Sequence, residues 1–320
     1  MHSNDPTIQW LLEAGDASVR YFTLTELLEM PADTPEAQAA RAQILESPRV
    51  QTLLSGQLPN GGFGVHPYQK WTGAHWRLVS LVELGIPPDE PHARLAAGQV
   101  LNWLCGDSHR RRIPRINGLT RRCASQEGNA LAVCSRLDLS GDERVQTLAA
   151  SLIEWQWPGG GWNCDRRPAA RHASFYESLA PLWGLIEYHQ ATGDPGSLVA
   201  ARRAAELFLS HHVFRSDKTG EVIDPEWLRL HYPLYWRYDI LQALTILSRL
   251  GPLTDPRLQD ALNLIEARRL SSGQWRVEAC YWRPPGKAAS NVEVVDWGRR
   301  GPHTMLTLNA LRVLKSAARL

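Results

Sequence analysis

The feature that most constrains the fold of this chain is a repeated plan: a turn rich in glycine and tryptophan, followed by an amphipathic run. The clearest turns lie at residues 56–64, 154–162 and 272–275, and weaker copies lie between and after them. The amphipathic runs end at intervals of 54–63 residues, and the ends fall near Met30, Gly85, Leu139, Gly193, Gly251 and Leu314. Regular self-similarity of this length predicts an array of six supersecondary units.

Each unit has the pattern of two helices. In one run Leu78, Leu81 and Val82 are spaced by three and four residues, which is the stripe of an amphipathic helix. The second run of several units begins with a capping residue and a proline, as in Thr34-Pro35, Asp194-Pro195 and Asp255-Pro256. Strand signals are few, and the best is the isolated stretch 292–295. The sequence therefore predicts an all-α protein.

Six helical hairpins in a chain of this length are expected to form one domain over residues 1–320. An open solenoid needs polar units at its two ends, and neither end of this chain is specially polar. We therefore expect the hairpins to close into an (α/α)6 toroid, with inner and outer helices around a central cavity.

The turns resemble the repeats of the terpenoid cyclase and protein prenyltransferase superfamily, whose fold is an α/α toroid. The residues that carry the resemblance are Gln156 to Trp162, with weaker versions at Gln57 to Phe63 and Gly273 to Trp275. The Asp-x-Asp-Asp acid motif of the squalene–hopene type and the aspartate-rich magnesium motif have no counterpart here. The resemblance thus implies the fold and an isoprenoid or other apolar small molecule as ligand.

The resemblance also bears on metal binding. Prenyltransferase β subunits hold zinc with an Asp-x-Cys pair and a later histidine. Here Cys164-Asp165 has the reverse order, and Glu177 stands where the histidine is expected. Cys164, Asp165 and His172 could bind zinc, but their spacing fits no fixed ligand pattern. We therefore expect no bound metal and no cofactor.

The densest cluster of candidate functional residues is the stretch 231–239. Tyr235 and Asp239 are four residues apart, so a helix starting here would place them on one face. An aspartate among aromatic rings is desolvated, and the pKa of its carboxyl rises, as a general acid requires. This pattern predicts Asp239 as the catalytic acid, assisted by His231, Asp165 and Glu177.

Further candidates come from aligning the first turns of the six inner runs. The aligned positions are Asp16, Gly73, Gln126, Ser174, Asp239 and His303. If these turns face the cavity mouth, aromatic and histidine side chains around them line a ligand site. The predicted substrate-binding residues are Trp71, His75, Trp76, Tyr176, Tyr232, Tyr235, Trp236 and His303. Such residues at helix starts also serve as caps without any ligand.

Charge and cysteine content limit the classes of function. A net charge of +2 disfavours a nucleic-acid-coating protein. No apolar run approaches the ~20 residues of a membrane span, and residues 1–30 show no secretory signal. Five cysteines without a C-x-x-C pair favour a reduced, cytoplasmic protein.

Six arginines between residues 110 and 122 could hold a diphosphate or a carboxylate if they reach the cavity mouth.

The sequence thus predicts a cyclase-like or prenyltransferase-like enzyme that uses acid chemistry in an aromatic cavity. Two alternatives stay open. A hydrolase or lyase for polar substrates would place two carboxylates, such as Asp165 and Asp239, across the cavity. A protein without catalytic activity would use the cavity or the ring face to bind an apolar ligand or a partner. The sequence does not determine the oligomeric state.

Overall fold

The structure is a computed structural model that describes residues 3–111, 113–287 and 289–320. Most of these residues are helical, as the sequence predicts. The only two strands of the described part, β1 (Arg115–Ile116) and β2 (Leu119–Thr120), form a small antiparallel hairpin. The helices are α1 (Pro6–Glu13), α2 (Ala17–Phe22) with a π turn (Thr23–Leu27), α3 (Pro35–Glu46), α4 (Pro48–Leu54), α5 (Ala74–Glu83), α6 (Pro91–Cys105), α7 (Asp107–Arg110), α8 (Ser125–Arg136), α9 (Glu143–Trp155), α10 (Phe175–Thr192), α11 (Pro195–Ser210), α12 (Ile240–Leu247), α13 (Gln259–Ala267) and α14 (Thr304–Ser316).

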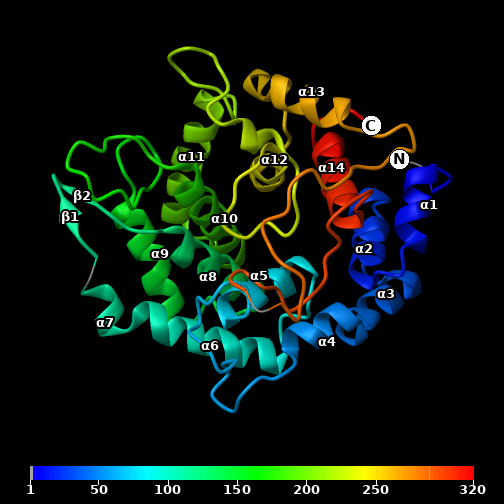
Figure 1. The fold of residues 1–320 in the computed structure, drawn as a ribbon, viewed down its shortest axis with the longest axis horizontal. Helices are drawn as coiled ribbons and strands as arrows, with labels where there is room; N and C mark the ends of the chain where they lie inside the picture. Colours follow the sequence, from blue (N-terminus) through cyan, green and yellow to red (C-terminus); the bar gives the residue numbers. More distant parts are fainter. Residues whose placement is uncertain (1–2, 112, 288) are drawn as a thin grey trace.

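The helices follow one another in two rows (Figure 1). In the first row α5 contacts α8, α8 contacts α10, α10 contacts α12 and α12 contacts α14, and α14 contacts α2. In the second row α3, α6, α9 and α11 each pack on the first-row helix that precedes them, and α13 packs on α14. The last helix of the chain thus lies beside α2, near the beginning of the chain. We call α2 with its π turn, α5, α8, α10, α12 and α14 the inner helices.

Two of the repeated turns make the same hydrogen bonds. The indole N–H of Trp162 donates to the carbonyl of Leu152 at 3.0 Å, and that of Trp275 donates to the carbonyl of Ile265 at 2.8 Å. The backbone N–H of Trp162 donates to Ser178, and that of Trp275 donates to the Thr307 hydroxyl, both at 3.0 Å. Both indoles are buried. Each tryptophan therefore fills a junction between helices.

The glutamines of these turns satisfy carbonyl groups of neighbouring segments. The Gln57 amide donates to the carbonyl of His92 and the Gln156 amide to that of Ala200, each at 2.8 Å. The predicted helix starts at Thr34, Asp194 and Asp255 are also confirmed, because each side chain caps a helix or 3-10 turn whose first residue is proline. These residues have structural roles.

Helices α8 and α10 cross at unusually close range. A Cβ atom on Gly128 would lie 2.2 Å from the backbone nitrogen of Pro181, and one on Gly184 would lie 2.4 Å from the carbonyl oxygen of Gly128. Only glycine at both positions lets the two backbones approach this closely. The crossing fixes the first turns of both helices relative to each other.

One local prediction is wrong. The run expected to be helical from Tyr235 begins only at Ile240, with Asp239 as its N-cap, so Tyr235 and Asp239 do not share a helix face. Tyr235 adopts a left-handed backbone conformation with φ of 47°, which no helix can contain. The stretch 292–295 forms no strand; Val292 makes only an isolated bridge to Arg283.

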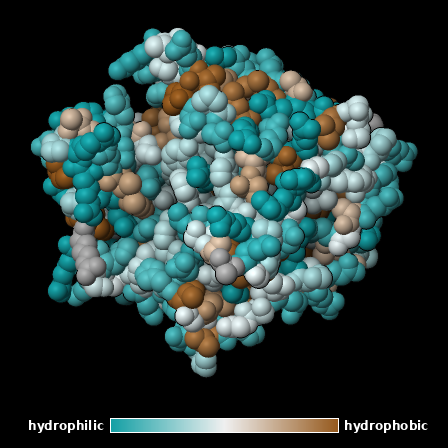
Figure 2. Space-filling model, in the orientation of Figure 1, coloured by the Kyte–Doolittle hydropathy of each residue, from teal (hydrophilic) through white to brown (hydrophobic). Residues whose placement is uncertain are grey.

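The face of the molecule in Figure 2 is mostly hydrophilic, and apolar residues gather there only in small groups. Among the described residues, no helix combines the length and the apolar character that crossing a membrane requires.

Candidate functional site

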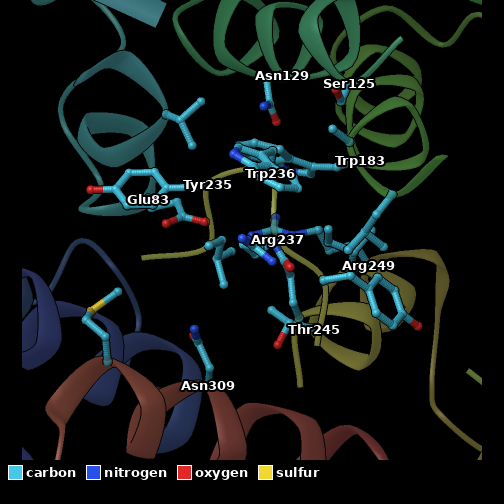
Figure 3. Close-up of a pocket in the computed structure, with 18 of the residues that line it drawn as sticks. Glu83, Ser125, Asn129, Trp183, Tyr235, Trp236, Arg237, Thr245, Arg249 and Asn309 are labelled. Carbon is cyan, nitrogen blue, oxygen red and sulfur yellow. The ribbon is translucent and has the colours of Figure 1, made fainter. Parts of the chain in front are cut away.

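The inner helices surround a cavity of about 100 Å³. Residues from all six of them line it, and the segment Leu234–Tyr238 lies across one side (Figure 3). Because this segment precedes α12 and is not helical, its side chains reach positions that helical spacing does not predict. The cavity is the candidate functional site.

One part of the cavity wall is aromatic. Trp183 of α10 and Tyr176 at its start lie there with Tyr235 and Trp236 of the covering segment. The ring of Trp71 stacks on the ring of Tyr235 at a centroid distance of 3.6 Å and an interplanar angle of 11°. The hydroxyl of Tyr235 and the indole N–H of Trp236 have no partner within the described part of the chain. The wall thus offers apolar faces with two unused polar atoms.

Another part of the site is charged, and each inner helix or the turn that continues it contributes one residue. These residues are Glu26, Glu83, Arg136, Glu187, Arg249 and Arg312. All of them except Glu187 line the cavity, and Glu187 pairs with the lining residue Arg249. We call this set the charged ring. Its formal charge is zero, because three carboxylates face three guanidinium groups.

Four members of the charged ring are paired. Arg312 contacts Glu26 at 2.6 Å, and Arg249 contacts Glu187 at 2.8 Å. Glu83 and Arg136 lie on the adjacent helices α5 and α8, yet neither forms an ion pair or side-chain hydrogen bond with another described residue, and the Oε2 atom of Glu83 is buried without a partner. These two groups are therefore available to a ligand.

Burial changes the ionisation of this pair. Desolvation raises the pKa of Glu83 to about 7, although Arg136, Arg249 and Arg312 act in the opposite direction. Burial lowers the pKa of Arg136, because it disfavours the charged guanidinium. Near neutral pH the Glu83 carboxyl exists in both protonation states, which is what proton donation to a bound molecule requires.

Two amides add hydrogen-bonding capacity. The Nδ2 atom of Asn129 on α8 and the Oε1 atom of Gln242 on α12 are buried without a described partner, and both side chains line the cavity. In Figure 3, Asn129, Asn309 and Glu83 project from different helices toward the same space. Unpaired buried polar atoms are costly, so their convergence here indicates a place for water or a polar ligand group.

Asp239, the predicted acid, lies outside the lining of this cavity as far as the structure describes it. It is buried and accepts from the backbone N–H of Gln242 at 2.7 Å and from that of His231 at 3.1 Å. Its carboxylate also contacts Nδ1 of His231 at 2.8 Å. The structure thus brings Asp239 and His231 together, with the carboxylate engaged as a helix cap.

The predicted substrate-binding residues divide into two groups. Tyr176, Tyr235 and Trp236 line the cavity. The others are buried and do not line it within the described chain; they are Trp71, His75, Trp76, Tyr232 and His303.

The two histidines of that second group are largely neutral at physiological pH. Burial lowers the pKa of His75 to about 3 and that of His303 to about 4. His303 caps α14 through Leu306 and contacts the Trp297 carbonyl at 2.7 Å. Its position at a helix start thus gives it a structural partner.

Asp165 and Glu177, which were predicted to assist the acid, do not line the central cavity within the described chain. Asp165 is paired with Arg167 in an exposed loop, and hydrogen bonds from Arg167 lower its pKa to about 2. Glu177 lies in the first turn of α10 and accepts from the backbone and the hydroxyl of Ser125. Burial raises its pKa. Its Oε1 atom lies 3.6 Å from Sγ of Cys164, so these are the residues of this region that could hold a metal.

The arginine-rich segment 110–122 does not reach the central cavity within its described part, and Arg112 lies outside the described residues. Arg121 packs on the ring of Trp157 and donates to the Ala170 carbonyl. Arg122 forms an ion pair with Glu127 at 2.6 Å. Both line a second, surface groove together with Cys123 and Cys164.

Glu83 and Arg136 were not predicted from the sequence, although a signal for them exists. Each member of the charged ring lies a few residues before the end of an amphipathic run, at Met30, Gly85, Leu139, Gly193, Gly251 or Leu314. A charged residue two to six residues before the end of each of the six runs is a pattern that comparison of the run ends would reveal. Alignment of the runs at their starts instead selected residues that cap helices, such as Asp16, Asp239 and His303.

Comparisons with known proteins give no family. No family model matches the chain, and no curated protein matches it. Among solved structures, a protein from Actinoplanes is similar over 96% of this chain and 90% of its own length, with 16% identity and a TM-score of 0.42.

Proposed function

We propose that the chain is an (α/α)6 toroid of six helical hairpins. Support comes from the contacts that run from α5 through α8, α10, α12 and α14 to α2. The identical hydrogen bonds of the Trp162 and Trp275 turns support the repeat. In such a ring, each inner helix presents one equivalent position to the centre, which accounts for the charged ring.

Within this fold we propose an enzyme that protonates a small, largely apolar molecule in the central cavity. The observation that carries this proposal is Glu83: its Oε2 atom is buried without a partner among the described residues, in a cavity that aromatic side chains also line. Its pKa of about 7 makes proton donation possible near neutral pH. Glu83, rather than the capped Asp239, is therefore the acid that we propose for the cyclase-like chemistry expected from the sequence.

The other lining groups define the ligand. Faces of Trp183, Tyr235 and Trp236 can stabilise positive charge that develops on a protonated substrate. Arg136, which has no ion pair in the described chain, fits a carboxylate or phosphate at one end of the molecule. A ligand with an apolar body and an anionic end, such as a short isoprenoid diphosphate, fits both features.

Cavity size limits the ligand further. A cavity of about 150 Å³ holds benzene, and this one has about 100 Å³. A cavity of this size holds a molecule of only a few carbon atoms. A longer chain requires that the segment Leu234–Tyr238 move away from the cavity.

The proposal is tested with deuterium. The protein is incubated in D2O with five-carbon and ten-carbon isoprenoid alcohols, carboxylates and diphosphates, and products are analysed by mass spectrometry. Glu83 in D2O transfers a deuteron to one carbon of the double bond, and the resulting cation then loses a neighbouring proton to the Glu83 carboxylate or captures D2O, so the product carries deuterium on carbon. We expect incorporation with the wild-type protein and at least a ~100-fold loss in Glu83→Gln, since general acid catalysis contributes about 10²–10⁴-fold.

Glu143→Gln serves as the matched control, because Glu143 is an exposed residue on the outer helix α9 and undergoes the same chemical change. Asp239→Asn tests the other acid. Turnover that survives in Glu83→Gln but disappears in Asp239→Asn, with both variants folded, would contradict the assignment of Glu83.

A further inference from the structure

Two cysteines and a carboxylate meet near the first turns of α8 and α10. The Sγ atoms of Cys123 and Cys164 and a carboxylate oxygen of Glu177 all lie within 4.8 Å of one another. Cys123 precedes α8, Cys164 lies in the loop before α10, and Glu177 lies in the first turn of α10. The close crossing at Gly128 and Gly184 holds these segments together.

The distance between two of the three atoms matches that of ligands around a zinc ion. Zinc bonds of about 2.3 Å to sulfur and about 2.0 Å to oxygen, at a tetrahedral angle, separate the two ligand atoms by roughly 3.5 Å. Sγ of Cys164 and Oε1 of Glu177 are 3.6 Å apart. An ion can therefore contact both atoms with little movement of the chain.

The carboxylate is already oriented for such a role. Its Oε2 atom accepts from the Ser125 hydroxyl at 2.8 Å and from the Ser125 backbone N–H at 3.1 Å. These bonds leave Oε1 directed at Cys164. Hydrogen bonds of this kind, made by groups that do not touch the metal, orient ligands in metal sites and strengthen binding.

The side of the cluster away from Glu177 opens to solvent. Cys123 and Cys164 both line the surface groove that His66, His109 and Arg122 also border, whereas Glu177 does not. Three protein ligands and a fourth position facing a groove are the arrangement of a zinc site that binds water or a ligand directly.

We propose that Cys123, Cys164 and Glu177 bind one Zn²⁺ ion, whose fourth position is open to this groove. Two thiolates favour a soft or borderline ion, and the carboxylate favours Zn²⁺ over Cu⁺. Sequence spacing did not reveal the site, because Cys123 comes from a different repeat. The site lies apart from Glu83 and does not depend on the proposed acid chemistry.

The test uses the purified full-length chain, prepared under reducing conditions and freed of metal with a chelator. It is titrated with Co²⁺, and Zn²⁺ is then added in competition. We expect one equivalent of Co²⁺, a thiolate-to-cobalt absorption band in the near ultraviolet, and displacement by Zn²⁺. Cys123→Ser and Cys164→Ser should each weaken binding at least ~100-fold, and Ser125→Ala should weaken it about 10–100-fold.

Cys105→Ser and Cys280→Ser are the matched controls, because both thiols are partly buried and lie outside the cluster. If a cluster variant does not fold, alkylation of the wild-type chain decides: bound Zn²⁺ should protect Cys123 and Cys164 but leave Cys105 and Cys280 reactive. The proposal is overturned by the absence of a thiolate band, by a band that persists in Cys123→Ser, or by a Cys123–Cys164 disulfide that forms in place of metal binding.

Discussion

The two ends of the inner helices use polar residues in opposite ways. At the N-terminal ends, Asp16, Asp239 and His303 accept hydrogen bonds from the first backbone N–H groups of α2, α12 and α14. Toward the C-terminal ends, Glu83 and Arg136 have no such partner among the described residues, and both line the cavity. A polar side chain at a helix start is taken up by the backbone, whereas one farther along the helix can remain available to a ligand.

The largest expected effect is the loss of stability when Asp239, at a helix N-terminal end, is replaced. Asp239→Ala removes the cap of α12 and leaves the His231 backbone N–H and ring unpaired in the interior. We expect a loss of about 3 kcal/mol in the free energy of unfolding, measured by urea denaturation. A loss below about 1 kcal/mol would show that Asp239 is not a structural cap.

Glu83→Gln, in contrast, should raise the free energy of unfolding near neutral pH. The pKa of Glu83 rises from 4.5 in the unfolded chain to about 7 in the folded protein, so the folded state binds the extra proton more tightly. Stability therefore falls as the pH rises through this window, by up to about 3 kcal/mol for this one group. Glutamine carries no charge and avoids the loss.

The measurement is the difference in unfolding free energy between wild type and Glu83→Gln across pH. The two curves should meet near pH 4 and separate above pH 7, with the variant more stable. Using the difference removes the contribution of Glu293, whose pKa burial also raises to about 7. A variant that is less stable than wild type at pH 8 would mean that Glu83 has a stabilising partner.

A smaller difference in stability is expected between replacing a paired arginine and replacing an unpaired one. Arg312→Met breaks the ion pair with Glu26, whose side chain is 45% exposed, and should cost about 1–2 kcal/mol. Arg136→Met removes a buried guanidinium without an ion-pair partner in the described chain, and it should leave stability unchanged or raise it. Thermal unfolding of both variants at pH 7 compares them directly, and equal losses would contradict the distinction.

The smallest effect concerns Asp16. This residue caps α2 by accepting from Ser18 and Val19, and it also contacts Arg49. Asp16→Ala should cost about 1 kcal/mol, a typical value for the loss of a cap. Asp16→Asn retains the cap and should recover most of this loss in the same urea experiment.

The sequence predicted what local residues determine. Glycine, proline and tryptophan mark the turns and helix starts by their own geometry, so the repeats and the all-α character could be read directly. In the structure the tryptophan of one such turn, Trp162, is buried. The arrangement of these helices as a closed ring stays a prediction.

The candidate site depended on contacts that no local pattern contains. The stretch 231–239 has helical spacing, yet stacking of Tyr235 on Trp71 and the contact of Tyr232 with Trp297 accompany a non-helical path. Packing across the molecule overrides local propensity here. The approach of Cys123 to Cys164 likewise depends on the crossing of α8 and α10, which joins two repeats.

The matching turns at Trp162 and Trp275 have a consequence for how this chain can be rebuilt. Each indole donates to a carbonyl ten residues earlier, and each backbone N–H donates to one hydroxyl, that of Ser178 or Thr307. Because the interactions are the same, the turn is an interchangeable module whose rules, once measured at one position, apply at the other. Such modules allow an array to lengthen or shorten by whole units during evolution, and they give a designer defined junctions for adding a unit or exchanging one.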